Sequence, residues 1–321
     1  MKTLVLGKKD LNELLSMPET IKAVENALKK DFSMPPKIYL NVPNGDYRAM
    51  PCHQGKFASI KWVSVYPANP SQGLPTVMAT LILNDASNAA PLAVMEAAQL
   101  TAFRTGAMAA IATKHLARPN SDVLALVGAG TQARTQLLAI QEVLPRLKEV
   151  RVTDAKPGLA EKFASEMQAK CRKARIMVAE SVEEAVRGAS VISTVTPSRT
   201  PIVQSDWVGE GAHVNAVGAD AAGKQELDPR ILKRAKVVVD NLEQASHSGE
   251  INVPISKGLF KESDVAAEIV DVVRNGKKVR QNEKDVTVFC STGLAVQDLA
   301  TASMVYEKAL KKGIGVQAEF V

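Results

Sequence analysis

The residues with the clearest chemical potential form a glycine-rich turn near the middle of the chain. An apolar run from Leu124 to Val127 is followed by Gly128, Ala129, Gly130, Thr131, Gln132 and Ala133, and apolar residues then recur at helical spacing. In such a turn the first glycine permits the tight bend, the second lets the backbone approach a pyrophosphate, and the alanine keeps the helix close to its strand. The pattern predicts a dinucleotide site, although a strand, turn and helix without any ligand would look the same.

Polar residues at the ends of other predicted strands extend this site. Asp154 follows the strand predicted next, 149–153, and its carboxylate can accept hydrogen bonds from the hydroxyls of an adenosine ribose. We also place four residues at later strand ends on the rim of the cofactor: Thr194, Thr196, Val217 and Ser291. Their Ser/Thr-rich segments are also typical of plain loops. The cofactor expected from this set is a nicotinamide dinucleotide.

Three cations lie among apolar neighbours and form a second candidate site. Arg48, Lys61 and Arg104 each interrupt an apolar segment. Together they would suit a substrate carboxylate, because the guanidinium fork can donate two parallel hydrogen bonds to it. Taken singly, each is equally compatible with a surface cation whose stem lies along apolar side chains.

One carboxylate is the best candidate for acid–base chemistry. Asp220 follows the strand-like segment 215–219, and residues at the carboxyl ends of parallel strands line the crevice where ligands bind. It could orient a water or accept a proton, but an Asx turn or a helix cap would also use an aspartate there. No metal site is expected, because none of the histidines pairs with another at metal-ligand spacing: His53, His115, His213 and His247.

The elements that must position these residues fall into two kinds. The segment 37–96 alternates short β-rich stretches with turn signals, which predicts four or five strands of a mostly antiparallel sheet. Helices are predicted at 18–32, 97–116 and 292–312, the last packing back on the N-terminal sheet. Between them, strands alternate with helical patterns; the strand candidates are 123–127, 149–153, 175–178, 190–195, 212–217, 236–240 and 285–289. This alternation predicts a parallel, doubly wound sheet.

The expected fold is therefore α/β, with a Rossmann doubly wound parallel sheet inserted in an α+β domain for substrate binding and dimerisation. The α+β domain is expected to comprise 1–116 plus 300–321, and the dinucleotide-binding domain 117–299.

Composition excludes several classes of function. The chain has 321 residues, 46% of them hydrophobic, and a net charge of 40 minus 34, or +6. Its basic residues are dispersed, so no nucleic-acid partner is expected. No apolar run approaches the roughly 18 residues of a membrane span, and the N-terminus has no signal-peptide core. Three widely spaced cysteines fit a reducing, cytoplasmic location.

Taken together, the motifs resemble the ornithine cyclodeaminase/mu-crystallin family, and within it the archaeal-type alanine dehydrogenases most closely. The matching segments run in family order over nearly the whole chain: 48–51, 61–63, 73–76, 104–106, 128–133, 215–220, 223–228 and 291–298. The resemblance implies a homodimer whose NAD(P)-binding domain is inserted in a substrate domain. It also implies an amino-acid or imino-acid substrate.

The resemblance assigns roles to individual residues. It implies that Arg48, Lys61 and Arg104 hold the amino-acid carboxylate and that Thr76 lies near cofactor and substrate. Asp220 would be the catalytic acid/base, and we count Lys61 with it as catalytic. Asp154 favours NAD over NADP, because a carboxylate repels a ribose phosphate, although Lys156 leaves some room for NADP.

Two chemistries share such a scaffold, and both begin with hydride transfer from the substrate α-carbon. An alanine dehydrogenase hydrolyses the resulting imine to pyruvate, whereas an ornithine cyclodeaminase lets the substrate's own amine attack and forms proline. The segment 52–55 carries no carboxylate to hold a distal amine, which favours a small substrate. Cyclodeamination and the reduction of cyclic ketimines remain alternatives. At 221–223, Ala-Ala-Gly replaces a proline-containing sequence common in relatives, which should loosen the loop after Asp220.

Overall fold

The computed structural model describes residues 2–171 and 173–320, and the chain forms two compact units. Unit 1 comprises Met1–Arg104 and Leu294–Val321, and unit 2 comprises Thr105–Gly293. The first boundary falls inside a continuous helix, α3 (Ala98–Leu116), and the second falls just before α11 (Ala295–Lys312). The limits expected from the sequence, 116 and 300, lie further along the chain at both joins.

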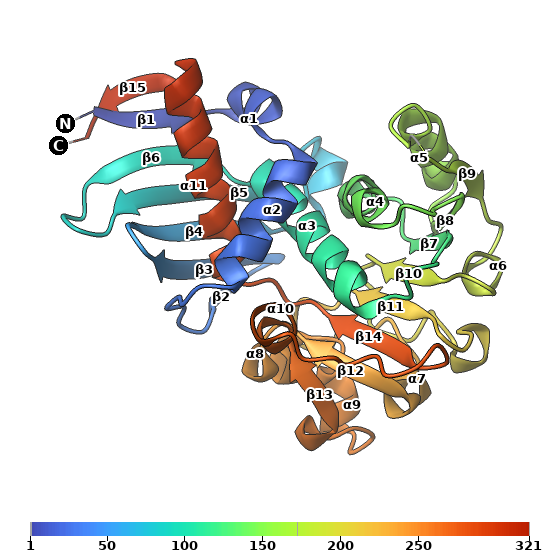
Figure 1. Cartoon of the computed structure of the whole chain (residues 1–321). Coiled ribbons are helices and arrows are strands. Elements are labelled where there is room, and N and C mark those ends of the chain that lie inside the picture. The colour runs from blue at the N-terminus through green and yellow to red at the C-terminus, as the bar shows by residue number, and fades with distance from the viewer. Residues whose placement is uncertain (1, 172, 321) are drawn as a thin grey trace. The chain divides into compact units, whose positions relative to one another are not determined.

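Unit 1 is built on a seven-stranded mixed sheet in the order β15-β1-β6-β5-β4-β3-β2 (Figure 1). The strands are β1 (Lys2–Leu6), β2 (Ile38–Val42), β3 (Gly45–Gln54), β4 (Phe57–Val65), β5 (Val77–Asp85), β6 (Pro91–Glu96) and β15 (Val316–Glu319). From β2 to β6 each strand pairs antiparallel with the next, so the prediction of four or five mostly antiparallel strands in 37–96 is confirmed, with five present. The two strands β1 and β15, which pair with each other, were not predicted.

Helices cover one face of this sheet. They are α1 (Lys8–Leu14), α2 (Met17–Leu28) and the long α11, and a 3-10 turn, η1 (Asn69–Gln72), precedes β5. The α11 helix contacts α2, β3 and β4, as the red and blue helices in front of the sheet in Figure 1 illustrate. Its buried residues recur at helical spacing, including Leu299, Ala302 and Val305. The predicted helix over 292–312, packed on the N-terminal sheet, is thereby confirmed.

Unit 2 contains an eight-stranded, all-parallel sheet in the order β13-β12-β14-β11-β10-β7-β8-β9. The strands are β7 (Val123–Val127), β8 (Glu149–Thr153), β9 (Arg175–Val178), β10 (Val191–Thr194), β11 (His213–Ala216), β12 (Ala235–Val239), β13 (Val265–Glu268) and β14 (Val286–Cys290). All seven predicted strands are present, and β13 is an eighth that was not predicted. The strand order reverses between β7 and β10, and ligands of doubly wound sheets bind at such switch points.

The helices of unit 2 lie between these strands and enclose two apolar cores. They are α4 (Thr131–Val143), α5 (Leu159–Met167), α6 (Val182–Val186), α7 (Pro229–Arg234), α8 (Leu242–Ser248), α9 (Asn252–Ser256) and α10 (Ile269–Asn275), with 3-10 turns η2 (Ser205–Trp207) and η3 (Glu262–Asp264). Alternate residues of β7 enter different cores: Leu124 and Leu126 pack with α4, whereas Ala125 and Val127 join the other cluster. This alternation follows from the two-residue repeat of a strand covered on both faces. Among the described residues, no helix is both long and apolar enough to cross a membrane.

Candidate functional site

The glycine turn lies at the carboxyl end of β7, beside the switch point. Gly128 has φ +101°, a conformation that favours glycine, and its N–H donates to the Thr153 carbonyl at 2.9 Å. A Cβ on Gly128 would lie 3.1 Å from the Val195 carbonyl oxygen. The turn is therefore wedged between the ends of β8 and β10, and a larger residue would disturb it.

Gly130 opens the other side of the turn. It caps the N-terminus of α4, and a Cβ added to it would meet nothing within 4 Å. Thr131 is exposed and Gln132 half-buried at the start of the helix, whereas Ala133 is fully buried against β7. The open space, together with the free N–H groups of a 13-residue helix, fits a dinucleotide pyrophosphate. The turn has the open backbone that the motif predicts, and the contacts with a cofactor remain a prediction.

Asp154 is bonded directly to the glycine turn. Its Oδ2 accepts from the backbone N–H of Ala129 at 2.8 Å, and its Oδ1 accepts from that of Lys156 at 2.8 Å. The carboxylate is half-buried, and each oxygen has further lone-pair capacity. It therefore stands beside the turn with its orientation fixed, as an acceptor for ribose hydroxyls requires.

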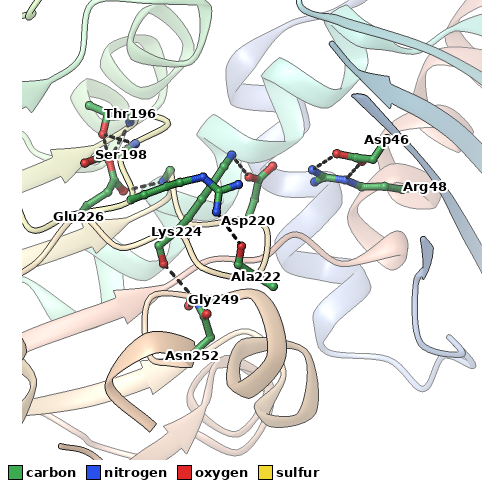
Figure 2. Close-up of polar contacts among 12 residues, drawn as sticks. Asp46, Arg48, Thr196, Ser198, Asp220, Ala222, Lys224, Glu226, Gly249 and Asn252 are labelled. Carbon is green, nitrogen blue, oxygen red and sulfur yellow. Dashed lines mark hydrogen bonds and ion pairs between the residues drawn. The ribbon is translucent and has the colours of Figure 1, made fainter. Parts of the chain in front are cut away.

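The strand-end threonines are organised by an acid that sequence reasoning did not single out. Glu226, fully buried, accepts hydrogen bonds from the Thr194 hydroxyl (2.8 Å), from the N–H and hydroxyl of Thr196 (2.7 and 2.8 Å) and from the Gly218 N–H (2.8 Å). Figure 2 shows Thr196 directed at this carboxylate. The Thr194 side chain is thus committed to Glu226 and fully buried, so it can rim a cofactor only through its strand.

Glu226 is paired with a second buried acid. The carboxylate of Glu250 accepts from the backbone N–H of Glu226 and of Leu227, at 3.0 and 2.7 Å. Burial raises the pKa of the Glu226 carboxyl, although the hydrogen bonds that it accepts lower this pKa. Burial and the neighbouring Glu226 raise the pKa of Glu250 well above its usual value. The remaining predicted rim residues, Val217 and Ser291, are buried where β11 and β14 end, with N–H groups bonded to Thr194 and Ala216 carbonyls.

Asp220 lies beyond β11 in the loop that Glu226 closes. It is partly exposed, and its Oδ1 accepts from the Lys224 ammonium at 2.5 Å. This ion pair is visible in Figure 2. The next helix, α7, begins only at Pro229, so Asp220 does not cap a helix, which was one alternative for this residue. Lys224 is a partner that the sequence did not reveal.

In unit 1, two of the three predicted cations meet on one carboxylate. The Lys61 ammonium lies 2.8 Å from both oxygens of Asp298, and the Arg104 Nε donates to Asp298 Oδ1 at 3.0 Å. All three side chains are buried, and Lys61 is 0% exposed. Desolvation, followed by the nearby Arg104 charge, lowers the pKa of Lys61 to about 7, although Asp298 opposes the change. The Arg104 Nη1 also donates to Gln297 at 3.1 Å.

Arg48 lies on the same face of the sheet as Lys61 but has a different partner. In the β3–β4 register Met50 faces Lys61 and Arg48 faces Val63, so both cations point to the side covered by α11. The Arg48 guanidinium pairs with Asp46 at 2.7 Å (Figure 2). Thr76 is half-buried just before β5, and its carbonyl accepts from the Tyr66 N–H at 2.8 Å.

The one deeply buried histidine belongs to the scaffold of unit 2. The His213 ring nitrogens bond to Thr287 (2.9 Å) and Asn215 (3.1 Å), and Asn215 continues to Thr113 of α3 at 2.9 Å. Burial lowers the pKa of His213 to about 3, so the ring is neutral. Within residues 2–171 and 173–320, no three His, Cys, Asp or Glu side chains are grouped to hold a metal ion.

Comparison with known proteins shows which family shares this architecture. Residues 1–313 match the model of the ornithine cyclodeaminase/mu-crystallin family. The chain belongs to this family. An alanine dehydrogenase of Archaeoglobus fulgidus is 48% identical over 324 residues, which span 100% of this chain and 99% of that protein. A solved archaeal alanine dehydrogenase dimer with bound NAD has a TM-score of 0.95 at 48% identity, with 100% of both chains covered.

A second solved structure has the same TM-score at lower sequence identity. The Δ1-pyrroline-2-carboxylate reductase of Thermococcus litoralis, in complex with NADH and L-proline, has a TM-score of 0.95 at 39% identity, covering 98% of this chain and 100% of that one. The family, the α/β fold with a Rossmann-like parallel sheet, and the oxidoreductase class predicted from the sequence are thereby confirmed. The individual site residues stay predictions.

Proposed function

We propose that this family member is an NAD-dependent L-alanine dehydrogenase, which reversibly converts L-alanine and water to pyruvate and ammonia. The observation that carries the proposal is the coexistence of a dinucleotide-type turn and a buried cationic cluster in a chain 48% identical, over its full length, to an alanine dehydrogenase. The carboxylate-free segment 52–55 agrees with a substrate that has no distal amine.

The cofactor is NAD, and the residues of unit 2 suit it. Gly128 and Gly130 would leave room for the pyrophosphate, with Thr131, Gln132 and Ala133 beginning the helix behind it. Asp154 would accept the ribose hydroxyls and disfavour a 2′-phosphate. The strand-end residues Thr194, Thr196, Val217 and Ser291 would form the wall on the nicotinamide side. When bound, the nicotinamide accepts a hydride from the substrate α-carbon.

The substrate carboxylate is assigned to the cationic cluster of unit 1. Lys61 and Arg104 carry two positive charges against the single charge of Asp298, so the cluster retains one positive charge when Lys61 is protonated. A buried positive charge attracts a carboxylate strongly, because little water screens it. Arg48 in β3 and Thr76 just before β5 are also assigned to substrate binding.

Asp220 is assigned the proton chemistry. Once the α-carbon has lost its hydride, the substrate is an imino acid with an electrophilic carbon. The Asp220 carboxylate would accept a proton from a water as its oxygen bonds to that carbon. The same proton can then be returned to the amine, and as the bond between carbon and nitrogen breaks and ammonia leaves, the hydroxyl proton passes to Asp220 and pyruvate remains. The Lys224 ammonium beside Asp220 favours the ionised form that this role needs.

A substrate screen with both cofactors tests the proposal. We expect reduced nicotinamide to form from L-alanine and NAD, and to be consumed with pyruvate and ammonia. A cyclic ketimine reductase is the second candidate, because the Thermococcus reductase is 39% identical and was solved with L-proline. Turnover of Δ1-pyrroline-2-carboxylate but not pyruvate would replace our proposal with that activity. Proline formed from ornithine without net NADH would identify a cyclodeaminase.

We also propose a homodimer in the cytoplasm. The sheet face of unit 1 opposite α11 exposes large apolar side chains, namely Ile38, Leu40, Ile60, Trp62, Met78 and Ile82. A contiguous apolar face of this kind usually marks an interface, and the archaeal alanine dehydrogenase relative was solved as a dimer. Three buried, unpaired cysteines agree with a reducing compartment. Light scattering of the purified chain measures the oligomeric state directly.

A further inference from the structure

The loop that carries Asp220 is fixed at both ends by one side chain. Glu226 ends the loop, and its carboxylate reaches back to the Gly218 N–H at the beginning while also accepting from Thr196 of the neighbouring strand end. A Cβ on Gly218 would lie 2.1 Å from the Thr196 carbonyl oxygen. The backbone at Gly218 therefore passes so close to the end of β10 that a side chain would not fit. The position of Asp220 is therefore determined by its anchors at either side.

A second residue fixes the middle of the same loop. The Asn252 side chain of α9 accepts from the Gly223 N–H at 3.0 Å and donates to the Lys224 carbonyl at 3.1 Å. Arg199, from the segment after β10, donates to the Ala222 carbonyl at 3.3 Å. These contacts hold the Ala-Ala-Gly segment, for which the lost proline predicted a loose loop. They also pin the backbone from which the Lys224 side chain extends (Figure 2).

The Lys224 side chain forms an ion pair with Asp220. It is 16% exposed, and its ammonium lies 2.5 Å from Asp220 Oδ1. The other charged groups on this loop and on the elements packed against it have separate partners. Arg199 is bonded to a backbone carbonyl, Glu226 to four donors, and Glu250 to the backbone N–H groups of Glu226 and Leu227.

We propose that Lys224 is the positioning residue of Asp220: it orients the carboxylate and keeps it ionised for the acceptance of a proton. The inference rests on the acid/base role proposed for Asp220. An adjacent cation lowers a carboxyl pKa by about one to three pH units, and partial exposure places this pair at the low end of that range. Removing the Lys224 charge would therefore favour the protonated form of Asp220.

Three variants test the role of Lys224. Lys224→Gln removes the charge and keeps a long polar side chain, Lys224→Arg keeps the charge, and Lys233→Gln removes an exposed lysine of the same unit as the matched control. The carboxyl carbon of Asp220 is followed by NMR titration of the ¹³C-labelled full-length protein, with Asp220→Asn to assign its signal. The pH dependence of kcat/KM for alanine oxidation is measured on the same proteins.

We expect the titration midpoint of Asp220 and the acidic limb of kcat/KM to rise together by about one pH unit in Lys224→Gln. Both should return toward wild type in Lys224→Arg and stay unchanged in Lys233→Gln, with NADH affinity preserved throughout. A Lys224→Gln midpoint equal to that of wild type would overturn the inference, as would a limb that does not follow the midpoint. If wild type does not oxidise alanine, the proposed function fails, but the NMR titration still decides whether Lys224 controls Asp220.

Discussion

Replacing Lys61 with methionine should remove a pH dependence from the stability of unit 1. The wild-type ammonium is fully buried, and its pKa is lowered to about 7 from an ordinary 10.5, mainly by desolvation and then by Arg104. Between these two pH values the unfolded chain holds a proton that the folded chain has released. The free energy of unfolding therefore rises with pH across this window, and the contribution is lost as pH falls through 7.

The size of the effect follows from the pKa difference. The interval from about 7 to 10.5 is about 3.5 pH units, and each unit corresponds to ~1.4 kcal/mol, which gives ~5 kcal/mol over the whole window. Between pH 7 and pH 8.5 the wild type should gain about 2 kcal/mol relative to the Lys61→Met variant. Methionine fills a similar volume, so the comparison isolates the charge from the packing.

Tryptophan fluorescence allows unit 1 to be followed by itself. The chain has two tryptophans, Trp62 in β4 and Trp207 in unit 2. In a Trp207→Phe background, urea unfolding monitored by Trp62 reports the strand that carries Lys61. Lys22→Met, an exposed lysine in α2, is the control and should track wild type at both pH values. If the free energy of unfolding changed with pH in the same way in wild type and Lys61→Met, the buried Lys61 ammonium would not be the cause.

Three further predictions concern unit 2. Asp154→Ser should shift the ratio of kcat/KM for NAD over NADP by about tenfold or more toward NADP, because a charged acceptor for the ribose is worth roughly 1.5–3 kcal/mol. Gly218→Ala should destabilise the fold by about 1–3 kcal/mol, since its Cβ would meet Thr196 at 2.1 Å, whereas Gly130→Ala should unfold like wild type in chemical denaturation yet bind NADH more weakly. The imidazole NMR signals of His213, with a pKa of about 3, should not shift between roughly pH 5 and 9; a titration near pH 6.5 would contradict its burial.

Repeating patterns made most of the fold predictable. The parallel strands of unit 2 are apolar runs between helical patterns, and the antiparallel strands of unit 1 alternate with clear turn signals. The three missed strands lack such signals. β13 (Val265–Glu268) and β15 (Val316–Glu319) have four residues each and lie at sheet edges, while β1 is a short segment whose partners are far along the chain. Pairing between strands that are far apart in the sequence leaves no pattern in the residues of either strand.

The candidate site was predictable in its residue types but not in its pairings. Lys61 is conspicuous as a cation among apolar residues, yet its partner Asp298 lies 237 residues away. Glu226 and Asp298 both fall inside segments that resemble the family, but a motif does not state which side chain a residue contacts. Lys224 is only four residues from Asp220, but the segment between them is a loop, where this spacing does not by itself bring two side chains together.

The division of the chain also constrains the order in which it can fold during synthesis. Unit 2 is one continuous stretch, Thr105–Gly293, whereas unit 1 is made from both termini. Asp298 and the strand β15, which pairs with β1, leave the ribosome only after the whole of unit 2. Until then Lys61 and Arg104 lack the Asp298 carboxylate, and β1 lacks its β15 partner. Unit 2 is therefore synthesised in full before unit 1 has all of its elements.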